Sequence, residues 1–135
     1  MAITIAAGQR ITSTWLNQLV PQPWVPWASI ASGWQNSTGN VPAQCRFLNA
    51  VTIQVVGTLA VTSNASSAIG NITIGNLPSG YFPSQAFNSS YGIDGLAGTG
   101  YFLNIRTDGS IHLYGLPALT TSEPVGINAI IAQDA

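Results

Sequence analysis

Apolar residues recur at every second position through much of the chain after residue 46. The pattern is clearest over residues 51–56 and 125–131. A period of two is the signature of a strand that buries one face. Further short apolar segments follow one another, separated by turns at intervals of roughly 8–12 residues. We therefore predict an all-β fold, an antiparallel β-sandwich of jelly-roll-like type with about seven to eight strands.

The strongest local turn signal is Asp108-Gly109. This pair separates residues 102–107 from residues 110–114, two segments that both alternate. Such a pair predicts a β-hairpin with Gly109 at a positive φ. Gly57 interrupts the strand predicted over residues 51–61 and suggests a bulge or a bend. The glycine-rich stretch Asp94–Gly100 is predicted to be a flexible loop.

The first 45 residues differ from the rest, and we predict an N-terminal anchor arm over 1–45 and a β-sandwich knob over 46–135. Thr12 is a suitable N-cap for a short helix that Pro21 and Pro23 would end. A helix of about two turns is not stable alone, so its apolar side chains must dock on their own domain or on another subunit. The predicted attachment or oligomer contacts are Ile11, Trp15, Leu16, Leu19, Trp24 and Trp27, although the tryptophans fit a core role equally well.

The chain carries very little charge. Charged residues make up 5% of it, there is no lysine, and the net charge is −1; an average soluble domain has roughly 25% charged residues. So little charge gives weak protection against self-association, and with the many aromatic residues it predicts a homotrimer. Three dispersed arginines cannot form a nucleic-acid-binding stripe. We expect no membrane insertion and no signal peptide, and Cys45 has no internal disulfide partner, as suits synthesis in a reducing cytoplasm.

Catalytic chemistry has little support in the sequence. His112 follows Asp108 by four residues, so the two side chains could share one strand face, but Asp108 is better explained as the turn residue. One histidine, one cysteine and four scattered carboxylates do not suggest a metal site. We therefore expect no enzymatic activity, no metal and no cofactor.

Aromatic residues near predicted loops leave binding as an alternative. A sugar site needs flat rings together with directional hydrogen bonds. The candidate glycan contacts are Trp34, Tyr81, Tyr91, Tyr101 and His112. The competing interpretation, which we favour, assigns these aromatics to the core or to a subunit interface.

Two segments resemble a known family. Residues 77–83, Leu-Pro-Ser-Gly-Tyr-Phe-Pro, resemble the "LP-x-G-Y-x-P" loop of knob domains in phage tail and receptor-binding proteins. In that pattern the loop follows a strand similar to Val51–Leu59 and precedes a hairpin similar to Ile105–Leu113. The opening residues 8–12 and 15–17 resemble the start of minor structural proteins of phages that infect actinobacteria.

The resemblance implies a trimeric antiparallel sandwich exposed on a virion, able in some members to bind host saccharides. Only some 45 residues precede the first clear strands, and they contain no heptads or collagen-like repeat. This short anchor favours a capsid decoration protein or head fibre bound to the major capsid protein. The alternative is a minor tail or receptor-binding knob that recognises host cell-wall glycans, and a small hydrolase is a third reading. In the first two cases the protein is made in the host cytoplasm and resides in the virion.

Overall fold

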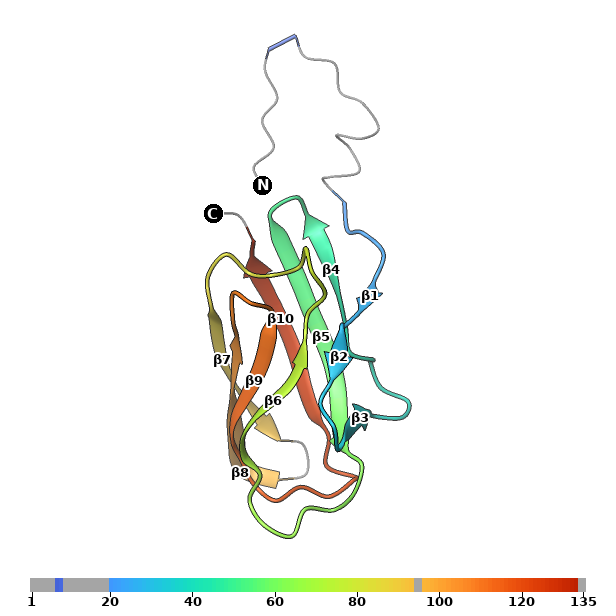
Figure 1. Cartoon of the computed structure of the whole chain (residues 1–135), viewed down its shortest axis with the longest axis vertical. Coiled ribbons are helices and arrows are strands. Elements are labelled where there is room, and N and C mark those ends of the chain that lie inside the picture. Colours follow the sequence, from blue (N-terminus) through green and yellow to red (C-terminus); the bar gives the residue numbers. More distant parts are fainter. Residues whose placement is uncertain (1–6, 9–19, 94–95, 134–135) are drawn as a thin grey trace.

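The computed structural model describes residues 7–8, 20–93 and 96–133, and it has two antiparallel sheets packed face to face (Figure 1). Sheet A contains β1 (Val25–Pro26), β4 (Gln44–Asn49), β5 (Thr52–Val61) and β10 (Val125–Ala132), with β3 (Trp34–Asn36) also paired to β5. Sheet B contains, in order, β2 (Ser29–Ile30), β6 (Gly70–Asn76), β9 (Ser110–Leu116), β8 (Leu96–Ile105) and β7 (Phe87–Ile93). The predicted all-β sandwich is confirmed.

The predicted helix after Thr12 lies outside the described residues. Among those that are described, no helix is long and apolar enough to cross a membrane.

The core lies between the sheets and follows the alternation in the sequence. Every second residue of β10 from Val125 to Ile131 is buried, and its neighbours are exposed. Leu103 and Ile105 of β8 face Ile111 and Leu113 of β9 in the ladder and are fully buried with them. Burying one face of each sheet in this way supplies most of the free energy that holds the sandwich together.

The tryptophan-rich segment is part of the sandwich. Its chain pairs with sheet A at β1, crosses to sheet B at β2 and returns at β3. Between the first two strands, Trp27 enters the core, and its indole Nε1 donates a hydrogen bond to the carbonyl of Gln44 at 3.2 Å. Residues 25–45, which the sequence analysis counted with the arm, are therefore integrated in the two sheets.

Two glycines make room for Trp27. A Cβ atom at Gly75 would lie 2.8 Å from the indole ring and 2.6 Å from the carbonyl oxygen of Ser29. A Cβ at Gly57 would lie 3.0 Å from the Cα of Ala43. The ladder between β5 and β10 runs through Gly57 without a register shift, so Gly57 makes no bulge in this ladder. Because Gly57 has no side chain, the backbone of Ala43 can lie close to β5.

Hydroxyl groups close the sandwich along the side where β10 lies. β10 is the edge strand of sheet A, and three of its carbonyls accept hydrogen bonds from side chains outside that sheet. Tyr101 donates to the carbonyl of Gly126, Tyr91 to that of Asn128 at 3.0 Å, and Ser84 to that of Ala132 at 3.4 Å. These contacts occupy backbone acceptors that an edge strand otherwise leaves open.

The Asp108-Gly109 hairpin forms as predicted. Gly109 has a φ of 84°, its amide donates to the carbonyl of Arg106 at 2.9 Å, and its carbonyl accepts from the amide of Leu77 at 2.8 Å. The last contact docks the start of the loop 77–83 on the hairpin, and the ring of Phe82 from the same loop packs against Gly109. Ahead of the hairpin, β8 already begins at Leu96, so the predicted loop over Asp94–Gly100 was too long.

The two ends of the sandwich differ in what they carry (Figure 1). The segment before β1 lies at the end where β10 finishes, and the loop 77–83 and the turn between β8 and β9 lie at that end too. The opposite end carries the loops that follow β5 and β9. These two loops are joined by hydrogen bonds from the amide of Ala65 to the carbonyl of Leu119 at 2.8 Å and from the amide of Thr121 to Oδ1 of Asn64 at 3.0 Å.

Candidate ligand-binding face

The outward side chains of β7, β8 and β9 gather polar and aromatic groups on one surface. Because inward positions alternate with outward ones, the buried residues of these strands leave the intervening side chains on the outside. Cross-strand register places Ser90, Phe102 and Tyr114 in one row, and Asn88, Asn104, His112 and Thr73 in the next. We call this surface the outer face of sheet B. Its main members are Asn88, Phe102, Asn104, Arg106, His112 and Tyr114.

A chain of hydrogen bonds orients the polar groups of this face. Nδ2 of Asn104 donates to Oδ1 of Asn88 at 2.8 Å. Arg106 links the same amide to the next strand: its Nε donates to Oδ1 of Asn104 at 3.1 Å, and its guanidinium Nη2 donates to the hydroxyl of Tyr114 at 2.9 Å. The long Arg106 side chain is therefore held in place before any ligand arrives, which reduces the entropy that binding costs.

Several donors of the network remain available to a ligand. Within the described part of the chain, the side-chain NH₂ of Asn88 and Nη1 of Arg106 have no partner, and the Tyr114 hydroxyl accepts a bond while keeping its own hydrogen. Beside them the ring of Phe102 is 64% exposed. A shallow hollow of about 510 Å³ lies here, lined by Asn88, Ser89, Ser90, Phe102, Leu103 and Tyr114. Fixed donors beside an open ring are suited to a ligand with acceptor oxygens and an apolar face.

His112 is fixed by hydroxyl groups on both sides. The Ser110 hydroxyl donates its single hydrogen to Oδ1 of Asp108 at 2.5 Å. Ser110 Oγ must therefore accept at its 2.9 Å contact with Nε2 of His112, which places the imidazole proton on Nε2. Nδ1 in turn accepts from the hydroxyl of Thr73 at 3.1 Å.

This arrangement differs from a nucleophilic triad. The carboxylate of Asp108 accepts hydrogen bonds from the amide and hydroxyl of Ser110 and closes the hairpin turn. In a Ser-His-Asp triad, the carboxylate accepts from Nδ1 and the histidine accepts from the serine, whereas here Nε2 donates to Ser110. The hydrogen bonds from Ser110 lower the pKa of Asp108. Burial and then the Arg106 guanidinium lower the pKa of His112, while Asp108 acts in the opposite sense.

The fold of the chain is similar to that of a phage domain. No protein-family model matches the chain, and no curated protein matches its sequence. Among solved structures, it is similar to the head domain of phage bIL170, described in connection with a common fold for the receptor-binding domains of lactococcal phages. The TM-score is 0.54 at 19% sequence identity, and the match covers 81% of this chain and 97% of that one. At this identity the likeness concerns the fold.

The structure places the candidate glycan contacts in different parts of the molecule. His112 alone lies on the outer face of sheet B. Trp34 and Tyr101 are buried in the core. Tyr81 is half-buried, with its ring 4.8 Å from that of Phe47, and Tyr91 stacks on Tyr101 at 5.6 Å. Trp34 and Tyr101 therefore belong to the core, and Tyr81 and Tyr91 pack against it.

Most of the residues that accompany His112 on this face were not predicted from the sequence. Asn88, Phe102, Asn104, Arg106 and Tyr114 were not singled out. A signal was present for β8 and β9, because a hairpin about Asp108-Gly109 with a period of two places Phe102, Asn104 and Tyr114 on the side of His112. No local signal brings in Asn88, since the pairing of β7 with β8 had not been predicted.

The predicted attachment residues also differ in where they lie. Ile11, Trp15, Leu16 and Leu19 lie outside the described residues. Trp27 is buried in the core, as described above. Trp24 is 37% exposed, and the guanidinium carbon of Arg46 lies 4.1 Å from the centre of its ring. Of the contacts within the described ranges, Trp24 is thus the one available at the surface.

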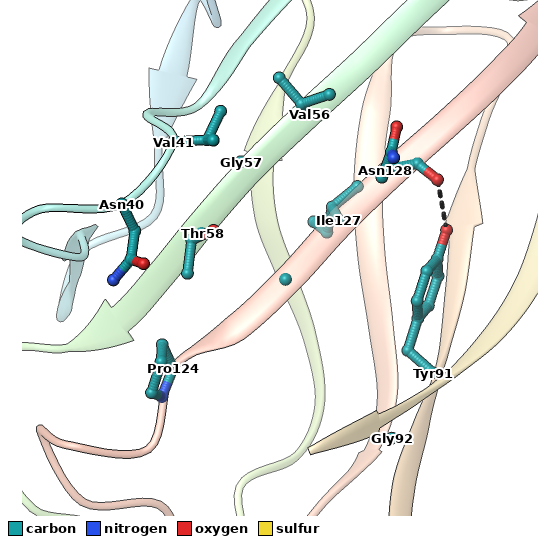
Figure 2. A pocket seen from close by; sticks show the side chains of 11 residues that line it. Asn40, Val41, Val56, Gly57, Thr58, Tyr91, Gly92, Pro124, Ile127 and Asn128 are labelled. Carbon is teal, nitrogen blue, oxygen red and sulfur yellow. Dashed lines mark hydrogen bonds between the residues drawn. The ribbon is translucent and has the colours of Figure 1, made fainter. Parts of the chain in front are cut away.

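A second hollow, of about 490 Å³, lies on the outer side of sheet A (Figure 2). It extends over β5 and β10 and is bordered by the loop before β4 and by the end of β7. Its lining is Asn40, Val41, Val56, Gly57, Thr58, Tyr91, Gly92, Pro124, Gly126, Ile127 and Asn128, with no charged side chain. This hollow and the outer face of sheet B therefore differ in chemistry, since one is uncharged and the other is rich in fixed donors.

Proposed function

We propose that this chain is a non-enzymatic surface protein of a bacteriophage particle, and that its sandwich is a receptor-binding knob that recognises a host saccharide. The observation that carries the proposal is the outer face of sheet B, where Asn88 and Tyr114 line a hollow together with the exposed ring of Phe102, and Arg106 orients the Tyr114 hydroxyl. Sugar rings offer both hydroxyl oxygens and flat apolar patches, so they fit such a surface.

The fold comparison supports the virion part of the proposal. The similar domain belongs to a phage and was described among receptor-binding domains, which favours the receptor-binding alternative over simple decoration of a capsid. Attachment through the N-terminal segment, with Ile11, Trp15, Leu16 and Leu19 as anchors on a tail or capsid component, remains part of the proposal. Replacing Trp15 and Leu16 together by alanine is expected to abolish incorporation into particles while the sandwich stays folded.

Saccharide recognition can be tested with purified protein. We expect the protein to bind host cell-wall polysaccharide in a glycan-binding screen, and Phe102→Ala to weaken that binding at least about tenfold, since a buried aromatic anchor commonly contributes 2 kcal/mol or more. Ile130→Ala is the matched control, because Ile130 is 59% exposed but lies on sheet A. Equal binding by Phe102→Ala and the unchanged protein would contradict the site, and turnover of the polysaccharide would contradict the non-enzymatic assignment.

A further inference from the structure

The hollow on the outer side of sheet A has a floor of backbone between two polar side chains. The register of β5 with β10 places Thr58 opposite Gly126 and Val56 opposite Asn128, and alternation turns all four away from the core. Gly126 has no side chain, and a Cβ atom there would meet nothing within 4 Å. A flat ring can therefore lie over Gly126 with Thr58 and Asn128 at its edges.

The polar side chains around this floor have hydrogen-bonding groups to spare. Within the described chain, the hydroxyl of Thr58 and the carboxamide of Asn128 form no hydrogen bond. Asn40 adds an oriented acceptor from the loop before β4. Its Nδ2 donates to the hydroxyl of Ser37 at 3.0 Å and to the carbonyl of Thr38 at 3.4 Å, which leaves its Oδ1 open. The hollow thus offers both donors and acceptors.

The chemistry of the lining suits a neutral ligand that carries hydroxyl groups. No charged side chain lines the hollow, so an ionic ligand would lose hydration without gaining an opposite charge. Hydroxyl and carboxamide groups donate and accept, as the hydroxyls of a sugar do. Val41, which is 50% exposed, and Pro124 supply apolar walls for the C–H faces of a sugar ring (Figure 2). A volume of about 490 Å³ lies within the range of small-ligand sites.

We propose that this hollow binds an uncharged sugar residue, as a second site separate from the outer face of sheet B. The proposal does not rest on the function proposed above, because the two hollows share no lining residue. The two sites also differ in selectivity, since the guanidinium of Arg106 lies only beside the sheet B site. A polysaccharide that occupied both sites would be held more tightly than by either one alone.

Titration of the full-length protein, labelled with ¹⁵N, locates the site by NMR. The probe is an uncharged oligosaccharide that the protein binds on a glycan array. We expect it to shift the backbone amide signals of Thr58, Gly126 and Asn128. Gly126→Val fills the floor without a clash inside the subunit, and should weaken binding at least about tenfold because its side chain takes the place of the ring. The melting temperature of this variant should not fall, since a β-branched residue suits a strand.

A second variant removes one hydroxyl and nearly preserves the shape of the side chain. Thr58→Val should weaken binding about fivefold, the effect of one lost hydrogen bond. Thr52→Val is the matched control, because Thr52 lies on the same strand and the same side but outside the lining. It should bind like the unchanged protein.

The outcomes separate this site from the one on sheet B. Phe102→Ala should leave the shifts in sheet A unchanged. The proposal is overturned if no uncharged glycan binds, or if shifts are confined to sheet B residues such as Phe102 and Tyr114. It is also overturned if Thr58→Val binds as tightly as Thr52→Val, a comparison that holds even if Gly126→Val fails to fold.

Discussion

At the residue scale, Gly109 combines two requirements in one position. Its φ of 84° lies in the left-handed region, and a Cβ there would lie 2.4 Å from the ring of Phe82. Gly109→Val should therefore lower the free energy of unfolding by more than about 1 kcal/mol, because backbone strain and the displacement of Phe82 add. Urea denaturation measures the loss.

Gly39 allows the cost of backbone strain to be separated from the cost of displacing Phe82. Its φ is 77°, and a Cβ there would meet nothing within 4 Å. Gly39→Val should therefore lose only the cost of the backbone conformation. An equal loss in both variants would show that Phe82 moves aside freely, and an unchanged Gly109→Val midpoint would show that the turn accepts a side chain.

His112 makes stability depend on pH. Its pKa in the folded state is lowered from the ordinary value of 6.5, so the unfolded chain binds the proton more readily. Stability is then full above about pH 6.5 and declines as the pH falls toward the folded pKa. The melting temperature should fall on acidification through this range. His112→Gln, which keeps a donor near Ser110 but does not titrate, should show a smaller fall; an identical pH profile would rule out His112 as the cause.

At the scale of elements, the hydroxyl groups on the edge of β10 stabilise the closure of the sandwich. Tyr101 is buried, and its hydroxyl donates to the carbonyl of Gly126. Tyr101→Phe should lower the free energy of unfolding by about 1 kcal/mol, since it removes a hydrogen bond and leaves the acceptor less well satisfied.

Tyr91→Phe provides the comparison. Tyr91 is only half-buried and its hydrogen bond to the carbonyl of Asn128 is exposed, so water can replace the lost hydroxyl, whereas Tyr101 is buried. The loss measured by denaturation should therefore be smaller than for Tyr101→Phe. A reversed order would mean that the edge of β10 is held mainly at Asn128.

The long elements could be predicted from sequence because their signal is local. The strand predicted over 51–61 coincides with β5, and the alternation over 125–131 became β10. By contrast, β1, β2 and β3 have two or three residues each, too few for a period to be visible. Each is formed by its pairing with a distant strand, as Ser29 with Asn76. The packing role of Gly57 could not be predicted for the same reason, since the neighbours that leave no room for a side chain there are Trp27 and Ala43.

At the scale of the whole molecule, the sandwich should require its tryptophan segment. Removing residues 1–45 would delete Trp27, Trp34, Ala43 and Cys45 from the core. The fragment 46–135 should therefore fail to fold cooperatively, whereas 20–135 should melt like the full chain. Circular dichroism during heating distinguishes the two. A cooperative transition for 46–135 would support the predicted boundary at residue 46.

The candidate ligand-binding face is also a property of the whole molecule. Sequence indicated His112 and the hairpin around it, but the ligand-binding face needs β7 beside β8, and that juxtaposition is a property of the assembled sheet. Asn88 and Asn104 are 16 positions apart and share a hydrogen bond. Of the aromatic candidates, Trp34 and Tyr101 lie in the core and Tyr81 and Tyr91 pack against it, because a small sandwich needs large side chains between its sheets.

The segment before β1 and the end of β10 lie at one end of the sandwich, and the loop after β5 lies at the opposite end (Figure 1). Ser66 and Ser67 are exposed in the loop after β5, and the hydrogen bonds that tie this loop to its neighbour are made on either side of them, at Ala65 and Ile69. Loop tips of this kind accept inserted sequence at little cost to the fold. A peptide inserted between Ser66 and Ser67 would be carried at the far end of the sandwich from the chain entry, which makes the protein a scaffold for displaying foreign sequence.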